Sequence, residues 1–290
     1  MSLRAVLLLT CFIFPGYSTV QAQDTLFEIK PWDELSEQRF SRMSKSWLRM
    51  QRHQWLHAES RHFIYHARTM RRLETIAREA EWAGSMLQSW IPSREPDDKS
   101  HIFIIEDENV WALILEKAGP RENSIALHVD REVFILRVES RPVSFVDLTH
   151  ELVHVHLAQT YPDALPLWLE EGLAEHLGWK LASAYHASRG IQLYRQQGEA
   201  DLDAWIDWDT LFALRRYPDD PARNRMFYRQ SGALVRAWLE KHGMENLPAW
   251  LDRVARVASK NQTDLLRESE DWIRMLDHVK QKLHQSDQSL

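Results

Sequence analysis

The sequence predicts an α+β protein, with a small N-terminal mixed α/β lobe that carries a short sheet and a mainly helical C-terminal lobe. Compact runs of β-branched and aromatic residues are confined to the part before Pro142. After Pro142, segment after segment repeats its apolar residues at helical spacing. The length of 290 residues suits one large domain or two lobes around a shared cleft.

The expected elements follow one another with few gaps. Residues 23–59 read as a helical lead-in, residues 60–260 as the main domain, and residues 261–290 as an amphipathic helix (264–284) with a frayed tail. The mixed lobe extends to about Arg141. Strands are expected at 62–65, 101–105, 124–129 and 132–138, with Asp130-Arg131 as a tight hairpin between the last two. Helices are expected at 70–90, 110–117, 143–159, 167–179, 181–197, 224–242 and 246–258.

Composition excludes several classes of protein. Apolar residues make up 44% of the chain and charged residues 27%, which is ordinary globular usage and excludes a disordered or collagen-like chain. The net charge is −6 and no basic run tracks a phosphate backbone, so nucleic acid is not an expected partner. The thirteen Trp are spread along the sequence and suggest a large packed core.

Residues 1–22 are typical of a secretory signal peptide. Arg4 precedes an apolar stretch from Ala5 to Phe14, and Val20-Gln21-Ala22 supplies small residues before a cleavage point near Ala22. An uncleaved anchor is the alternative. Cleavage removes Cys11, the only thiol, and leaves no second stretch of membrane-span length. We therefore expect a periplasmic or extracellular protein without disulfides and without stable membrane insertion.

The segment His150-Glu151-Leu152-Val153-His154 carries the clearest chemistry. Histidines four residues apart lie on one helix face, so their imidazoles can bind one ion. Glu151 lies about 100° round the helix, where it can reach a water held by the ion instead of the ion itself. Neutral imidazoles, an open position for water and a carboxylate base are what a hydrolytic zinc site needs.

A third ligand is available downstream, in Pro166-Leu167-Trp168-Leu169-Glu170-Glu171-Gly172-Leu173-Ala174-Glu175. A short loop and a second helix would bring this segment back past the first helix, so the choice lies between Glu170 and Glu171. Glu175 is four residues after Glu171 and shares its face. A ligand at Glu171 would leave Glu175 free to accept a hydrogen bond from a ligand imidazole.

These two segments resemble the gluzincin zinc metallopeptidases, in particular the bacterial peptidase-MA-like group, which pairs a His-Glu-x-x-His helix with a Trp-Leu-x-Glu-Gly-x-Ala-Glu helix. The resemblance implies a zincin-like fold, one Zn2+ per chain, and Glu171 as the third ligand. It continues in the segment from Phe227 to Val235, which is similar to the family's later helix bearing a Tyr. By that likeness, Tyr228 is the candidate that stabilises the oxyanion of the transition state.

Several residues near the motif have simpler interpretations. Tyr228 would otherwise be a half-buried Tyr on an amphipathic helix, and Tyr185 and His186 are weaker rivals for its role. His156 lies nearly opposite the ligand face and suggests a structural role. Asp147 fits either a supporting role or a helix-start acid. A second metal site among the N-terminal histidines is disfavoured (His53, His57, His62 and His66).

We therefore expect a secreted or periplasmic zinc-dependent peptidase that uses Glu151 as general base on a peptide or protein substrate. The alternative is a non-catalytic metal-binding or assembly protein on a peptidase-like scaffold. The aminopeptidases of this clan carry a Gly-x-x-Glu-Asn motif, which Arg121-Glu122-Asn123 echoes only in part, so an endopeptidase or narrow processing enzyme is favoured. The strand at 124–129 is the candidate edge for a substrate backbone. The sequence carries no signal for the oligomeric state.

Overall fold

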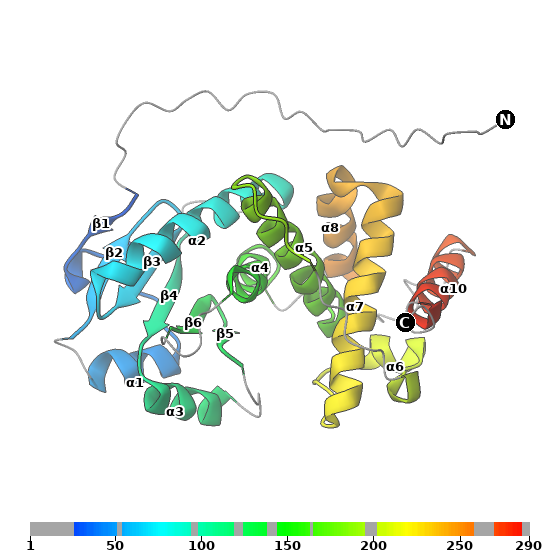
Figure 1. Cartoon of the computed structure of the whole chain (residues 1–290), viewed down its shortest axis with the longest axis horizontal. Coiled ribbons are helices and arrows are strands. Elements are labelled where there is room, and N and C mark those ends of the chain that lie inside the picture. Colours follow the sequence, from blue (N-terminus) through cyan, green and yellow to red (C-terminus); the bar gives the residue numbers. More distant parts are fainter. Residues whose placement is uncertain are drawn as a thin grey trace.

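The computed structural model describes residues 26–50, 54–93, 98–118, 124–137, 144–162, 165–194, 202–257 and 270–285. Within them the protein is mixed α/β. The N-terminal half contributes a sheet with helices between its strands, and the C-terminal half is helical (Figure 1). The expected signal peptide at 1–22 and the expected transition near Arg141 lie outside the described residues. No helix in the described part of the chain is long and apolar enough to cross a membrane.

In the described part of the chain, one mixed sheet of six strands forms the centre of the N-terminal half. Its strands lie in the order β1-β2-β3-β4-β6-β5, with β3, β4 and β6 parallel and the other pairs antiparallel. The short strand β5 is therefore an edge of the sheet, next to the tight turn at Asp130. The strands are β1 (Glu28–Ile29), β2 (Leu56–Glu59), β3 (Phe63–Ala67), β4 (Ser100–Ile105), β5 (Ala126–Val129) and β6 (Glu132–Leu136).

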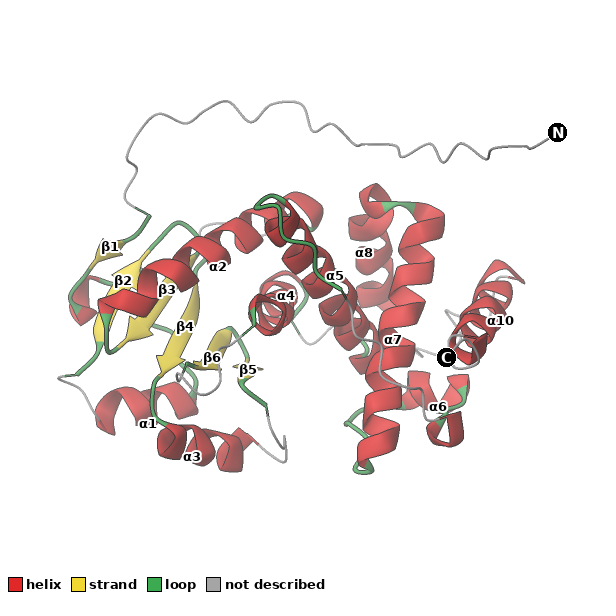
Figure 2. Cartoon of the chain, viewed as in Figure 1, coloured by secondary structure: helices red, strands yellow, loops and turns green. Residues whose placement is uncertain are grey.

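Helices lie on both faces of the sheet and continue beyond it (Figure 2). The helix α4 begins where the Ser144 hydroxyl accepts the backbone N–H of Asp147, and α7 begins with Asp220 as cap and Pro221 in its first turn. The helices are α1 (Arg42–Met50), α2 (Met70–Trp90), α3 (Glu108–Ala118), α4 (Phe145–Thr160), α5 (Leu167–Ala187), α6 (Trp208–Ala213), α7 (Pro221–His242), α8 (Leu247–Val257) and α10 (Glu270–Gln285).

The alternating side chains of the strands supply two separate apolar cores. On one face, Val133 and Ile135 join the core that α2, α4, α5 and α7 share. On the other face, Phe103 and Phe134 pack with Trp47 of α1 and Trp111 of α3. Because successive side chains of a strand lie on opposite faces of the sheet, every second residue of a strand is on the face that α4 covers.

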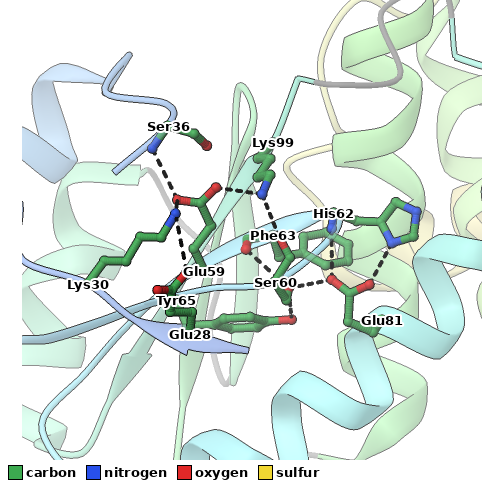
Figure 3. A network of polar contacts seen from close by, with 10 residues as sticks. All are labelled: Glu28, Lys30, Ser36, Glu59, Ser60, His62, Phe63, Tyr65, Glu81 and Lys99. Carbon is green, nitrogen blue, oxygen red and sulfur yellow. Dashed lines mark hydrogen bonds and ion pairs between the residues drawn. The ribbon is translucent and has the colours of Figure 1, made fainter. Parts of the chain in front are cut away.

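The second face is also held by buried polar groups. The Glu59 carboxylate accepts from Lys30, from Lys99 and from the Ser36 backbone N–H (Figure 3). These contacts, together with the burial that opposes them, leave the pKa of Glu59 at about 2. Glu132 similarly accepts from Ser41 and Ser44. The segment from 30 to 50 is thereby tied to the sheet.

Three histidines form a chain across the same face. The Nδ1 atoms of His57 and His66 lie 2.8 Å apart, and His66 Nε2 lies 3.0 Å from His101 Nδ1. Phe40 and Phe103 pack against the His66 ring. Burial lowers the pKa of all three imidazoles, that of His101 to about 4. All three imidazoles are therefore uncharged at pH 7.

The structure corrects three expectations. The lead-in at 23–59 is not all helical, because β1 and β2 belong to the sheet, which begins before residue 60. The separate helices expected at 167–179 and 181–197 are wrong, since α5 runs unbroken through Leu167–Ala187 and the chain leaves the helix there. The short helix α6 was not anticipated.

The helix α10 of the C-terminal segment packs against α7, and its residues Trp272, Met275 and Val279 join the larger apolar core.

The histidine chain predicts how stability depends on pH. His101 has a pKa of about 4 in the fold and about 6.5 when unfolded, so between these values the unfolded chain binds more protons. Stability should fall as pH falls through this window. Urea unfolding at pH 7.5 and at pH 5 gives the free energy of unfolding of each protein. Between the two pH values, His101→Phe should lose about 1–2 kcal/mol less of this free energy than the unsubstituted protein does. An equal pH slope in the two proteins would contradict the assignment.

Candidate metal centre

The two helices that carry the predicted ligands are held together by close backbone approach. A Cβ on Gly178 of α5 would lie 3.0 Å from the backbone N and Cα of His150 on α4. Beside it, the Thr149 hydroxyl donates to the Gly178 carbonyl at 2.8 Å. On its other side α5 meets α7, where a Cβ on Gly172 would overlap the Ser231 carbonyl oxygen. These contacts leave α5 little room to shift relative to either neighbour.

Three predicted ligands lie together at the junction of α4 and α5. The Nε2 atoms of His150 and His154 are 3.2 Å apart, and Glu171 Oε2 lies 3.5 Å from the first and 3.3 Å from the second. Ligand atoms bound tetrahedrally to zinc at 2.0–2.1 Å would be about 3.3–3.4 Å from one another. The two imidazole rings are inclined at 65°, so their lone pairs can converge. This buried group could hold a metal ion.

The structure separates the roles left open for the three glutamates of α5. Glu171 contributes its carboxylate to the triangle and is 2% exposed. Glu170 Oε1 instead lies 3.5 Å from His154 Nδ1, and Glu175 Oε1 lies 3.6 Å from His150 Nδ1. Each imidazole thus turns one nitrogen toward the triangle and the other toward a carboxylate.

The electrostatics of the triangle favour a cation. Glu171 Oε2 is buried without a hydrogen-bond partner among the described residues. Burial would raise the pKa of Glu171, but the charge of His154 and the contact with His150 hold it well below its usual range. Conversely, burial opposes charge on His154, yet Glu171 and Glu170 raise the His154 pKa to about 10. The carboxylates around the two imidazoles therefore favour positive charge at this position, which fits a site for a divalent ion.

The Glu151 carboxylate contacts the edge strand of the sheet. Its Oε2 accepts a hydrogen bond of 2.8 Å from Nδ1 of His128, which is on the edge strand β5. Burial would raise the pKa of Glu151, but His128, together with His150 and His154 of α4, lowers it to about 2. The side chain is thus a buried, ionised carboxylate beside the candidate metal ligands.

A second group, formed by His128, His154 and Glu170, also brings its ligand atoms close together. Here the ring geometry argues against a shared ion. His128 is stacked on His154 with centroids 4.0 Å apart and planes inclined at only 18°. An imidazole nitrogen binds a metal within the plane of its ring, so two parallel stacked rings do not converge on one ion. His128 therefore lies beside the candidate metal ligands without joining them.

Two tyrosines flank the ligands, and the sequence analysis identified one of them. Tyr228 on α7 has its ring 6.4 Å from that of His150. Tyr217, in the loop before α7, stacks on Tyr228 and donates its hydroxyl hydrogen to Glu171 Oε1. The rivals for the Tyr228 role are elsewhere, since Tyr185 packs on Phe145 with His186 beside it.

The other singled-out residues have structural contacts. His156 Nε2 donates to the Ile91 carbonyl at 2.6 Å, away from the ligands. Asp147 accepts from the Ser144 hydroxyl at the start of α4, as expected of a helix-start acid. His62 pairs with Glu81, and no group of potential metal ligands forms among the N-terminal histidines that the structure describes. His53 and the segment 121–123 lie outside the described residues.

Sequence reasoning missed His128 and Tyr217. Alternation along the strand at 124–129 places His128 and Ala126 on one face, but nothing in the pattern says that α4 covers that face. Tyr217 follows two arginines in a loop and carries no periodic signal. A scan against models of protein families gives no match for this chain, and no curated protein shows significant similarity to it.

The close approach at Gly172 generates a prediction. Gly172→Ala places a methyl group against the Ser231 backbone, which cannot rotate aside, so the free energy of unfolding should drop by about 1–3 kcal/mol. Because Glu171 is the adjacent residue, metal affinity should drop too. Chemical unfolding and chelator competition measure the two effects.

Gly84→Ala is the matched control for this substitution. Its new methyl group would lie 2.9 Å from Cε2 of the Phe63 ring, the far end of a side chain. We expect a smaller loss of stability and unchanged metal affinity. Equal effects of the two substitutions would argue against a backbone constraint at Gly172.

Proposed function

We propose that this chain is an exported zinc-dependent peptidase of the gluzincin type, with a zincin-like fold. The observation that carries the proposal is the buried triangle of His150, His154 and Glu171 with an ionised carboxylate, Glu151, beside it. Two imidazoles and one carboxylate are the protein ligands of many hydrolytic zinc sites, which keep a further position open. The proposed content is one Zn2+ per chain.

The proposed reaction is hydrolysis of a peptide bond. Bound zinc would supply Lewis-acid polarisation of the scissile carbonyl and lower the pKa of water. Glu151 accepts the proton of the attacking water as the oxygen adds to the carbonyl carbon. It then passes that proton to the amide nitrogen as the C–N bond breaks, and it ends the cycle as a carboxylate ready for the next water.

The residues around the ligands have proposed supporting roles. Glu175 orients His150 and Glu170 orients His154, each through the nitrogen that faces away from the ion. Tyr217 holds the second oxygen of Glu171. Tyr228, whose ring lies beside His150, is proposed to donate to the oxygen that gains negative charge in the transition state.

The substrate backbone is proposed to pair with the edge of β5. Among the described residues, that strand has a neighbour in the sheet, β6, on one side only, and its residue His128 contacts Glu151. A peptide added there would extend the sheet next to the metal ligands, by the mode known as β-augmentation. Recognition through the backbone fits a peptide or protein substrate and an endopeptidase or narrow processing enzyme.

Export is proposed from residues 1–22, with cleavage near Ala22 and a periplasmic or extracellular location. The competing function is a non-catalytic metal-binding or assembly protein on a peptidase-like scaffold. Glu151 favours hydrolysis over that alternative, because a purely structural ion needs no carboxylate base beside its ligands.

Glu151 and Glu171 have distinct proposed roles, and substitution should separate them. Glu151→Gln keeps shape but removes the base, so zinc content should stay near one per chain while turnover in a peptide-library cleavage assay drops by about 10²–10⁴-fold. Glu171→Ala removes a ligand, so zinc should be lost first and added zinc should partly restore activity.

The double variant His150→Ala, His154→Ala is the control for metal analysis, and it should bind no zinc at the site. Zinc content unchanged in that variant would remove the central claim. Full activity in Glu151→Gln would instead favour the non-catalytic scaffold, with any cleavage coming from a contaminant.

The two tyrosines should differ in the same assays. Tyr228→Phe should lower kcat by about 10²–10³-fold with little change in zinc affinity, because it removes a donor to the transition state. Tyr217→Phe should weaken zinc binding by about 10–100-fold, because it frees a ligand carboxylate. Chelator competition and steady-state kinetics measure the two effects. A loss of zinc affinity in Tyr228→Phe together with a loss of kcat alone in Tyr217→Phe would mean that the two tyrosines have each other's proposed role.

A further inference from the structure

We propose that His128 is a positioning residue that holds the Glu151 carboxylate in place from the edge strand β5. The inference rests on the proposed function, since Glu151 is the base of that reaction. Its starting point is a single contact between two elements. His128 Nδ1 donates to Glu151 Oε2 at 2.8 Å. The bond joins a strand to a helix, and the two residues are 23 positions apart in the sequence.

The register of the hairpin explains why His128 faces α4. His128 pairs with Val133 of β6, and Ala126 pairs with Ile135. Val133 and Ile135 belong to the core that includes α4, whereas Leu127 packs into the core on the other face of the sheet. His128 is therefore the polar member of an otherwise apolar row, and it lies where Glu151 needs a donor.

Two contacts fix the His128 ring itself. Its plane is stacked on His154 at a centroid distance of 4.0 Å, and its Nδ1 is engaged by Glu151. A carboxylate on a helix surface ordinarily samples several rotamers. The ring, packed on a metal ligand and hydrogen-bonded to the base, restricts Glu151 to one of them and links the base to its neighbour His154.

Positioning of this kind affects a particular kinetic constant. A base that samples several rotamers is less often aligned with the attacking water, and misplacement of a catalytic group lowers the rate of the chemical step. Ground-state binding of a peptide along the strand does not involve the carboxylate. Loss of His128 should therefore appear in kcat and leave KM nearly unchanged.

The chain offers a matched control pair. His62 Nδ1 donates to Glu81 at 2.6 Å, with side chains 16% and 13% exposed, against 17% and 11% for His128 and Glu151. Figure 3 shows the His62 pair at the start of β3, where the backbone N–H of His62 also donates to Glu81. Breaking this bond disturbs the fold to a comparable degree without touching the proposed metal ligands.

The experiment compares four variants with the unsubstituted zinc-loaded protein. His128→Leu removes the donor and keeps bulk, whereas His128→Asn keeps an N–H at the place of Nδ1. His62→Leu and His62→Asn repeat the design at the control pair. We expect His128→Leu to lower kcat by about 10–100-fold with KM and zinc content unchanged, His128→Asn to recover most of it, and both His62 variants to retain full kcat.

Three outcomes would overturn the proposal: an equal loss in His128→Leu and His62→Leu, a loss confined to KM, or no rescue by Asn. A second measurement does not depend on turnover. In ¹⁵N-histidine NMR spectra, His128 should be the Nδ1–H tautomer, and its resonance should shift in Glu151→Gln. An Nε2–H tautomer would refute the contact even if the protein cleaves no peptide, in which case the proposed function fails separately.

Discussion

A carboxylate that is 2% exposed, as Glu171 is, must be compensated by positive charge or hydrogen bonds. Two imidazoles and the Tyr217 hydroxyl surround it, and this requirement accounts for much of the arrangement nearby. α4 and α5 must approach closely enough for the histidines to reach the carboxylate, and Gly178 lies where their backbones meet. α7 and the preceding loop must then cover the remaining side. The same compensation can come from protons or from a metal ion, and the proposed chemistry depends on the ion.

The sheet contributes in a different way on each of its faces. One face supplies the apolar support for α4 and, through β5, a polar contact to Glu151. The other face is closed by the segment 30–50, anchored at Glu59 and Glu132 and packed around the neutral histidine chain. Glu132 belongs to β6, the strand that pairs with β5, so one strand takes part both in this anchoring and in the register of the edge strand.

Local periodicity predicted most helices and the common face of His150 and His154, because spacing of four residues on a helix determines which side chains share a face. It also predicted Glu171 and Glu175 on one face of α5. It did not predict β1 and β2, which are short and are held in the sheet by strand pairing, β1 with β2 and β2 with β3. The contacts of His128 and Tyr217 depend on sheet order and on helix packing over long sequence separation, so they have no local signal.

The continuous helix α5 has a mechanical consequence. Glu171 and Gly178 are seven residues apart on one rigid helix, close to two full turns, so the proposed third ligand and the contact with α4 keep a fixed angular relation. Insertion or deletion of one residue between them would rotate one feature about 100° relative to the other. We therefore expect insertions and deletions to be tolerated in the connections on either side of α5. Between Glu171 and Gly178 the number of residues has to stay constant.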